Sequence, residues 1–156
     1  KNYDVKIHPP SAIGDISGNI NINVSINTGC SSILPMLDSH KKISKKSYYK
    51  SVEEVKIITL DEIYKDYLNK DSRLLLKIDT QGYEFNVLKG ARKTLEKCEI
   101  ILIELQVRPL YEGQKLWEEM INLLNDYGFD LWHLEKVTKD PNNHRLLELD
   151  GIFLKR

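Results

Sequence analysis

Cysteine is scarce in this sequence, and long apolar runs are missing. The 156 residues include two cysteines, Cys30 and Cys98, which have neither C-x-x-C spacing nor a histidine at ligand spacing. This pattern excludes a disulfide framework and the common zinc sites. No apolar stretch approaches the roughly 18 residues of a membrane span, and no signal peptide is visible. We therefore expect reduced thiols in a cytoplasmic protein that does not enter a membrane.

An excess of one charge is also missing. Lys plus Arg and Asp plus Glu both number 23, and no basic stripe interleaved with aromatic residues occurs. This excludes the usual electrostatic footprint of nucleic-acid binding and favours a small neutral partner. The length fits a single domain, residues 1–156, that buries roughly two thirds of the surface of its unfolded chain.

The first half of the chain has weak periodicity. Residues 5–13 alternate around Pro9 and Pro10 and predict a strand that ends or bends there. Residues 20–26 alternate strictly, which predicts a hairpin partner or a sheet edge. Residues 28–51 predict a long loop with at most one helical turn. A strand is then expected over 52–58, and Thr59 with Glu62 predicts a capping box that begins a helix ending near residue 68.

The second half has stronger patterns. An apolar run at 74–78 predicts a central strand covered on both faces, followed by a tight turn at Gly82 and a short helix over 83–88. A second apolar run, 99–106, predicts a parallel neighbour. Residues 116–127 predict an amphipathic helix that Gly128 ends. Two last strands, 129–137 and 146–155, predict an antiparallel hairpin, so that the whole is the back half of a doubly wound α/β fold.

Polar residues follow both apolar strands. Asp79, Gln81 and Glu84 come after the first strand, and Glu104 ends the second. In an open α/β sheet, ligands bind in the crevice at the carboxyl ends of the strands. We therefore expect these side chains to face a pocket.

Several blocks carry a resemblance to a known family. KIDTQGYEFNVLKGA, from Lys77 to Ala91, is similar to the signature of the FkbM-type methyltransferases, and the resemblance extends to AIGD at Ala12, the Ser31–Ser32 pair and DGIF at Asp150. These blocks span nearly the whole chain in the family's order. The long block is fairly specific, whereas AIGD or the serine pair alone has no weight.

The resemblance implies a cofactor, a reaction and a fold. Members of the family use S-adenosylmethionine, mostly to methylate hydroxyl groups of sugars and polyketide-like metabolites, on a Rossmann-like class I methyltransferase sheet. The resemblance implies that Asp79, Gln81 and the segment of Ser11, Ala12 and Ile13 contact the cofactor. Substrate contacts are expected from three further residues, namely Ser31, Ser32 and His133. The simpler interpretation of His133 is a hydrogen-bonded residue in the wall of a strand. The simpler interpretation of the two serines is that they stabilise a turn or cap a helix.

One departure from the family pattern stands out. The acidic, glycine-rich turn that holds the cofactor's methionine part, and the strand whose acidic end grips the ribose, are not found before the signature. We therefore expect the C-terminal part of a longer enzyme with its first N-terminal strands missing. Open sheet edges would then favour homo-oligomers, low stability or a rearranged N-terminal segment.

Carboxylates are the candidate proton acceptors. Asp79 is the leading catalytic candidate, Glu104 the second and Glu84 the third. In the alternative interpretation, Asp79 and Glu84 cap the turn and helix while Glu104 pairs with Lys77. No metal is expected from their spacing.

Two further functions stay open. The first is a non-catalytic or degenerate methyltransferase-like domain that binds a carbohydrate-like ligand or a protein partner. The second is a nucleotide-dependent dehydrogenase, which ranks last because no Gly-x-Gly-x-x-Gly is present.

Overall fold

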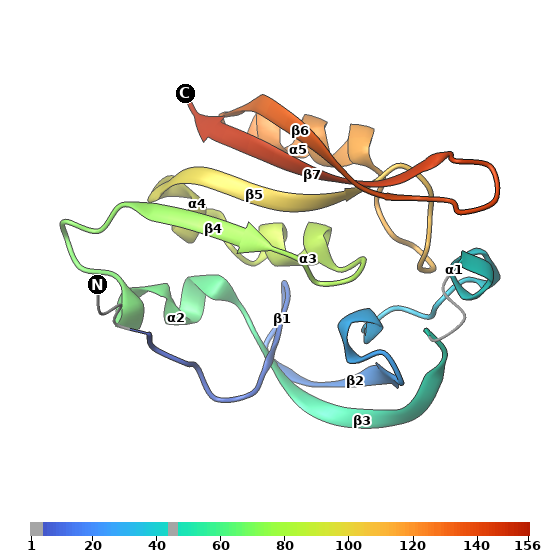
Figure 1. Cartoon of the computed structure of the whole chain (residues 1–156). Helices are drawn as coiled ribbons and strands as arrows, with labels where there is room; N and C mark the ends of the chain where they lie inside the picture. Colours follow the sequence, from blue (N-terminus) through green and yellow to red (C-terminus); the bar gives the residue numbers. More distant parts are fainter. Residues whose placement is uncertain (1–4, 44–46) are drawn as a thin grey trace.

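The computed structural model describes residues 5–43 and 47–156, and it contains two β-sheets with helices. One sheet has the strand order β1-β3-β2, and the other has the order β4-β5-β7-β6. The two sheets lie side by side, with β1 between them (Figure 1). The mixed α/β class expected from the sequence is therefore confirmed. No helix of the described ranges is long and apolar enough to cross a membrane.

The smaller sheet is formed by the N-terminal third of the described chain. Strand β1 (Ala12–Ile13) pairs in parallel with β3 (Tyr49–Ile58), and β2 (Gly18–Ser25) pairs antiparallel with β3. The expected sheet-edge strand at 20–26 is confirmed as β2. The prediction of a strand over 5–13 was wrong for all but its last two residues, because Pro9 and Pro10 have no N–H to donate to a ladder.

The segment 28–51 is more regular than the sequence predicted. It contains a 3-10 turn η1 (Thr28–Cys30) and a six-residue helix α1 (Asp38–Ile43), and its last residues already belong to β3. Met36 forms an isolated bridge with Tyr111. These long-range contacts order a stretch that has no local periodicity. The part of the expected loop at 44–46 lies outside the described residues.

The larger sheet confirms the expected order of the second half. Strand β4 (Leu74–Ile78) is parallel to β5 (Cys98–Gln106), and β7 (Leu146–Lys155) lies antiparallel between β5 and β6 (Phe129–Lys139). Strands β6 and β7 thus form the predicted hairpin, whose second strand inserts beside β5. The carboxyl ends of β4 and β5 meet at one edge of the sheet.

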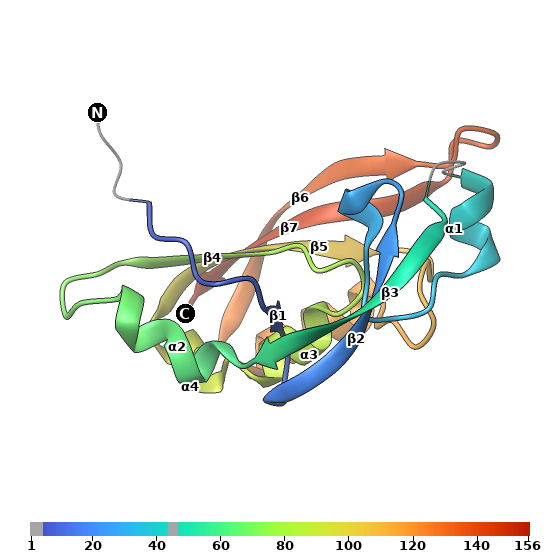
Figure 2. The same cartoon turned by 90° about the horizontal axis from the view of Figure 1, so that it is seen from below.

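Helices α3 (Glu84–Lys89), α4 (Arg92–Glu96) and α5 (Trp117–Asp126) cover one face of this sheet (Figures 1 and 2). Side chains from alternate strand positions fill the space beneath the helices and are all buried. The strand residues of this core include Ile78, Ile101, Ile103, Leu105 and Phe153. Each such side chain contributes about 1.5–3 kcal/mol to stability.

Strand β4 differs from the expected central strand. Ile78 is 2% exposed under the helices, but Leu75, on the opposite face, is 55% exposed. Within residues 5–43 and 47–156, β4 pairs only with β5, so it is an edge strand with one open face. Lys77 shares that face and reaches Asp79 at 3.2 Å. The apolar run therefore did not distinguish a strand buried on both faces from a strand with one exposed face.

Helix ends follow the local sequence signals. Helix α2 (Leu60–Tyr67) begins after Thr59, whose N–H donates to the Glu62 carboxylate at 3.0 Å, as the predicted capping pair requires. Gly128 follows α5 with a positive φ of 82°, as the predicted C-cap requires.

Contacts at Gly90 hold the two sheets together. A Cβ atom at Gly90, between α3 and α4, would lie 2.0 Å from the Gly14 carbonyl oxygen, so only glycine allows this approach. Next to it, Asp15 accepts hydrogen bonds from Lys89 at 2.8 Å and from Asn86 at 3.0 Å. These contacts place the residues that follow β1 beside α3 and its junction with α4.

Candidate functional site

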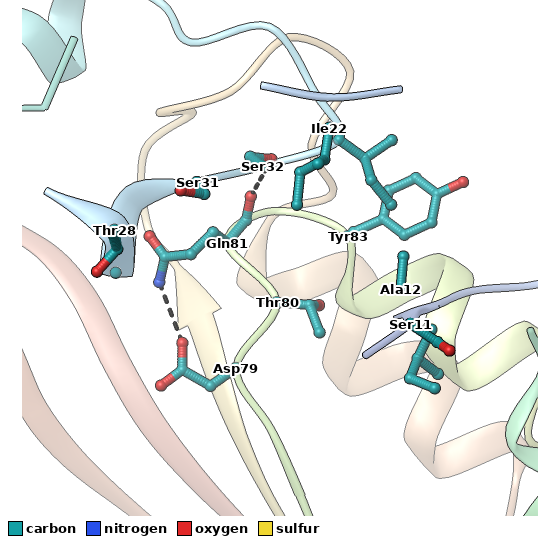
Figure 3. Close-up of a pocket in the computed structure, with 13 residues that line it drawn as sticks. Ser11, Ala12, Ile22, Thr28, Ser31, Ser32, Asp79, Thr80, Gln81 and Tyr83 are labelled. Atoms are coloured by element: carbon teal, nitrogen blue, oxygen red, sulfur yellow. Dashed lines mark hydrogen bonds between the residues drawn. The ribbon is translucent and has the colours of Figure 1, made fainter. Parts of the chain in front are cut away.

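A cavity of about 320 Å³ lies where three distant segments meet at the carboxyl end of β4 (Figure 3). We call it the first cavity, and its walls come from residues 11–13, 28–29, 31–33, 79–81 and Tyr83, with Ile22 from β2. It brings together most of the residues singled out in the sequence, namely Ser11, Ala12, Ile13, Ser31, Ser32, Asp79 and Gln81. Segments far apart in the chain thus form one site.

Asp79 lies at the wall of the first cavity, directly after β4. Its Oδ1 accepts a hydrogen bond from Gln81 Nε2 at 3.0 Å, and its Oδ2 lies 3.2 Å from Lys77 Nζ. The side chain remains 41% exposed. One amide and one ammonium therefore orient the carboxylate and leave lone pairs available to a ligand.

Gln81 connects the walls of the site. Its backbone has a φ of 53°, which is uncommon outside glycine, and the following Gly82 has a φ of 99°, as the predicted turn requires. Ser32 Oγ donates to the Gln81 carbonyl at 2.7 Å (Figure 3). Tyr111 donates its hydroxyl to Gln81 Oε1 at 3.0 Å. Gln81 is therefore held on both its backbone and its side chain.

Glu84 has a different position from the one expected for a proton acceptor. Its Oε1 accepts hydrogen bonds from Thr80 N at 2.8 Å, Thr80 Oγ1 at 3.1 Å and Gly82 N at 3.2 Å. Burial raises its pKa. Glu84 does not line the first cavity, so the geometry matches the alternative interpretation, in which this carboxyl caps the turn.

Glu104 lies one strand over, at the wall of a neighbouring cavity of about 320 Å³, which we call the second cavity. Its Oε2 accepts hydrogen bonds from Gln106 Nε2 at 2.9 Å and Gln81 Nε2 at 3.3 Å. Burial first, and then the charges of Glu148 and Asp79, raise the pKa of Glu104 to about 8. The pairing of Glu104 with Lys77, which belonged to the alternative interpretation, is not found, because Lys77 reaches Asp79 instead. Near neutral pH, Glu104 is mostly a neutral acid that can donate a hydrogen bond.

His133, like Glu84, is a predicted site residue that lines neither cavity. It lies on β6 with a 56% exposed side chain, 3.6 Å from Glu135. The substrate contact expected of His133 stays a prediction. The sequence predicted that His133 lies in a strand, but it did not predict which edge of the sheet that strand occupies.

Other residues of the site were missed by the sequence reasoning. Thr80 and Tyr83 line the first cavity and belong to the signature block itself, so that block was the signal for them. His40 lines the second cavity from α1, and its Nδ1 is buried without a hydrogen-bond partner among the described residues. Burial lowers the pKa of His40, and the charge of Glu148 offsets this only in part. No sequence pattern marked His40, because its place depends on the packing of α1.

The described residues hold no group of three or more His, Cys, Asp and Glu side chains that could bind a metal ion. Among known families, the sequence model described as the methyltransferase FkbM domain matches residues 2–131 of the chain. No curated protein and no solved structure shows significant similarity to the chain.

Proposed function

Because the chain belongs to the methyltransferase FkbM family, we propose that it transfers a methyl group from S-adenosylmethionine to a hydroxyl of a sugar or another small metabolite. The observation that carries the proposal is the first cavity, where the family's signature block meets residues 11–13 and the serine pair. We further propose that the sheet β4-β5-β7-β6 is part of a Rossmann-like methyltransferase sheet.

The chemistry of the first cavity fits this cofactor. Ile13, Ile22 and Tyr83 supply apolar surface of the kind that an adenine ring contacts, and Asp79 supplies a carboxylate for a cationic centre or a ribose hydroxyl. S-adenosylmethionine, when bound, supplies a methyl group on a positively charged sulfur. Ser11, Ala12 and Ile13 would hold its adenine end, with Asp79 and Gln81 at the strand end.

Asp79 is the proposed proton acceptor. A free carboxylate has a pKa about ten units below that of an alcohol, so it accepts the hydroxyl proton only as the new bond forms. The protein therefore acts mainly by aligning the reactants and excluding water. Gln81 and Lys77 fix the carboxylate's orientation for that purpose. Glu104 assists as a neutral hydrogen-bond donor, while Glu84 holds the turn.

Calorimetric titration of S-adenosylmethionine into the chain tests the proposal. We expect binding, with the affinity lowered about tenfold by Asp79→Ala, equivalent to about 1.4 kcal/mol. Asp71→Ala is the matched control, since Asp71 is an exposed carboxylate in the turn between α2 and β4 and lines neither cavity. Absence of binding to the unaltered chain would support the non-catalytic binding domain instead.

A further inference from the structure

The second cavity adjoins the first one. Both are lined by Gly29 and Gln81, and the second extends from there to α1, β5 and the β6–β7 hairpin. Gln81 Nε2 donates to Asp79 in one direction and to Glu104 in the other. A molecule in the second cavity therefore lies next to the group that separates it from Asp79.

The walls of the second cavity carry acidic groups. Glu104 and Glu148 line it, and the described lining residues include no lysine or arginine. Glu148 also accepts a hydrogen bond from Gln106 at 3.4 Å, which joins the two carboxyls through one amide. The charge of Glu148 would repel an anion in the cavity, whereas Glu104, which is mostly protonated near neutral pH, adds little to that repulsion. The cavity thus disfavours phosphate and carboxylate groups.

The remaining walls are amphipathic. Thr138 and Asn27 add uncharged polar groups, while Leu110, Val137 and Leu147 add aliphatic surface. Carboxylate and amide oxygens accept hydrogen bonds from hydroxyl groups, and aliphatic side chains suit the C–H faces of a saturated ring. This lining matches a polyhydroxylated molecule.

We propose that the methyl acceptor binds in the second cavity and is a neutral or cationic polyhydroxylated molecule without phosphate or carboxylate groups. This inference rests on the proposed function and narrows its substrate class. Glu104 and Glu148 hold the acceptor's hydroxyl groups, and Gln81 sets the boundary with the first cavity.

Cys30 provides a native probe of the second cavity, because it lines the cavity whereas Cys98, the other cysteine, is 2% exposed. The first measurement compares how fast cationic trimethylammonioethyl and anionic sulfonatoethyl methanethiosulfonate modify Cys30, each relative to a free thiol. We expect the cationic reagent to be favoured about tenfold, as for a local energy of about 1.4 kcal/mol. Glu148→Gln should reduce this preference. Glu135→Gln, an exposed acid on β6 outside both cavities, should leave it unchanged.

The second measurement is protection of Cys30 by glucose, glucosamine and glucose 6-phosphate at equal high concentrations. Protection by the first two but not by the phosphate is expected. Equal modification rates for the two reagents would overturn the proposed acceptor class. Protection of Cys30 by glucose 6-phosphate, or by none of the three sugars, would also overturn it. Binding of S-adenosylmethionine is measured separately on the unlabelled chain. Absence of that binding refutes the proposed function and with it the acceptor, while a wrong order of protection with intact cofactor binding refutes the acceptor class alone.

Discussion

Asp79 and Glu104 end neighbouring parallel strands, yet their surroundings give the two carboxyls different properties. Asp79 is 41% exposed beside Lys77, whereas Glu104 is buried beside other acids. Pairs of acids with such different environments are typical of sites where one group accepts a proton and the other donates a hydrogen bond.

At the scale of single residues, we predict that Asp79→Asn lowers the rate of methyl transfer about 100-fold, because asparagine cannot accept the hydroxyl proton. The melting temperature should change little, since the exposed pair with Lys77 contributes little stability. Radiolabelled methyl transfer and thermal melts measure the two effects. Intact turnover with a lower melting temperature would show that Asp79 is structural.

Glu104 should make stability depend on pH. Its pKa is about 8 in the folded chain against 4.5 in the reference state, so the folded state binds an extra proton between these values. The contribution of Glu104 to stability is therefore full below about pH 4.5 and is lost as the pH rises through about 8. We predict that Glu104→Gln removes roughly 2–4 kcal/mol of this fall. Urea unfolding at pH 6 and pH 9 measures the free energy of unfolding of the unaltered protein and of the variant. The other titrating groups are the same in both proteins, so their contributions cancel in the comparison. An equal change of this free energy with pH in the two proteins would contradict the prediction.

At the scale of single elements, the turn between β4 and α3 depends on Glu84. Glu84→Ala would leave the N–H groups of Thr80 and Gly82 without their acceptor, at a cost of about 2–4 kcal/mol. Glu84→Gln keeps one acceptor oxygen and should cost less. Denaturant unfolding compares the three proteins. Equal stability of the alanine and glutamine variants would mean that the turn does not need this acceptor.

The junction between α3 and α4 makes a second prediction. Gly90→Ala places a Cβ against the Gly14 carbonyl oxygen, so backbone must shift, and we expect a loss of about 1–3 kcal/mol. Gly29→Ala is the control, because its Cβ would meet nothing closer than 3.7 Å. Thermal melts measure both variants. A Gly90→Ala protein as stable as the control would show that the two sheets are not held at this point.

At the scale of the whole molecule, the exposed face and free edge of β4 in the larger sheet favour self-association. Leu75 is 55% exposed on β4, which has one free edge within the described part of the chain. We predict concentration-dependent self-association that Leu75→Lys weakens, measured by sedimentation velocity. Val52→Lys replaces an equally exposed residue on β3 of the other sheet and should have less effect. A chain that stays monomeric at all concentrations would contradict this prediction.

Local sequence predicted the elements where neighbours along the chain decide them. The Thr59–Glu62 capping pair, the positive φ of Gly82 and the end of α5 shortly before Gly128 all depend on residues within a few positions. The β6–β7 hairpin followed from the two predicted strands 129–137 and 146–155 and the short loop between them. Residues 5–13 failed as a strand because prolines override a weak alternation.

The sequence by itself determined the family, the parallel pair β4 and β5, and the carboxylate at the tip of each strand. Only the tertiary structure decided that residues 11–13 and the serine pair share a cavity with Asp79, that His40 lines the second cavity and His133 does not, and that burial raises the pKa of Glu104. The physical reason is that hydrogen-bonding patterns and periodicity act over a few residues, whereas burial and charge depend on groups that folding brings together from distant parts of the chain.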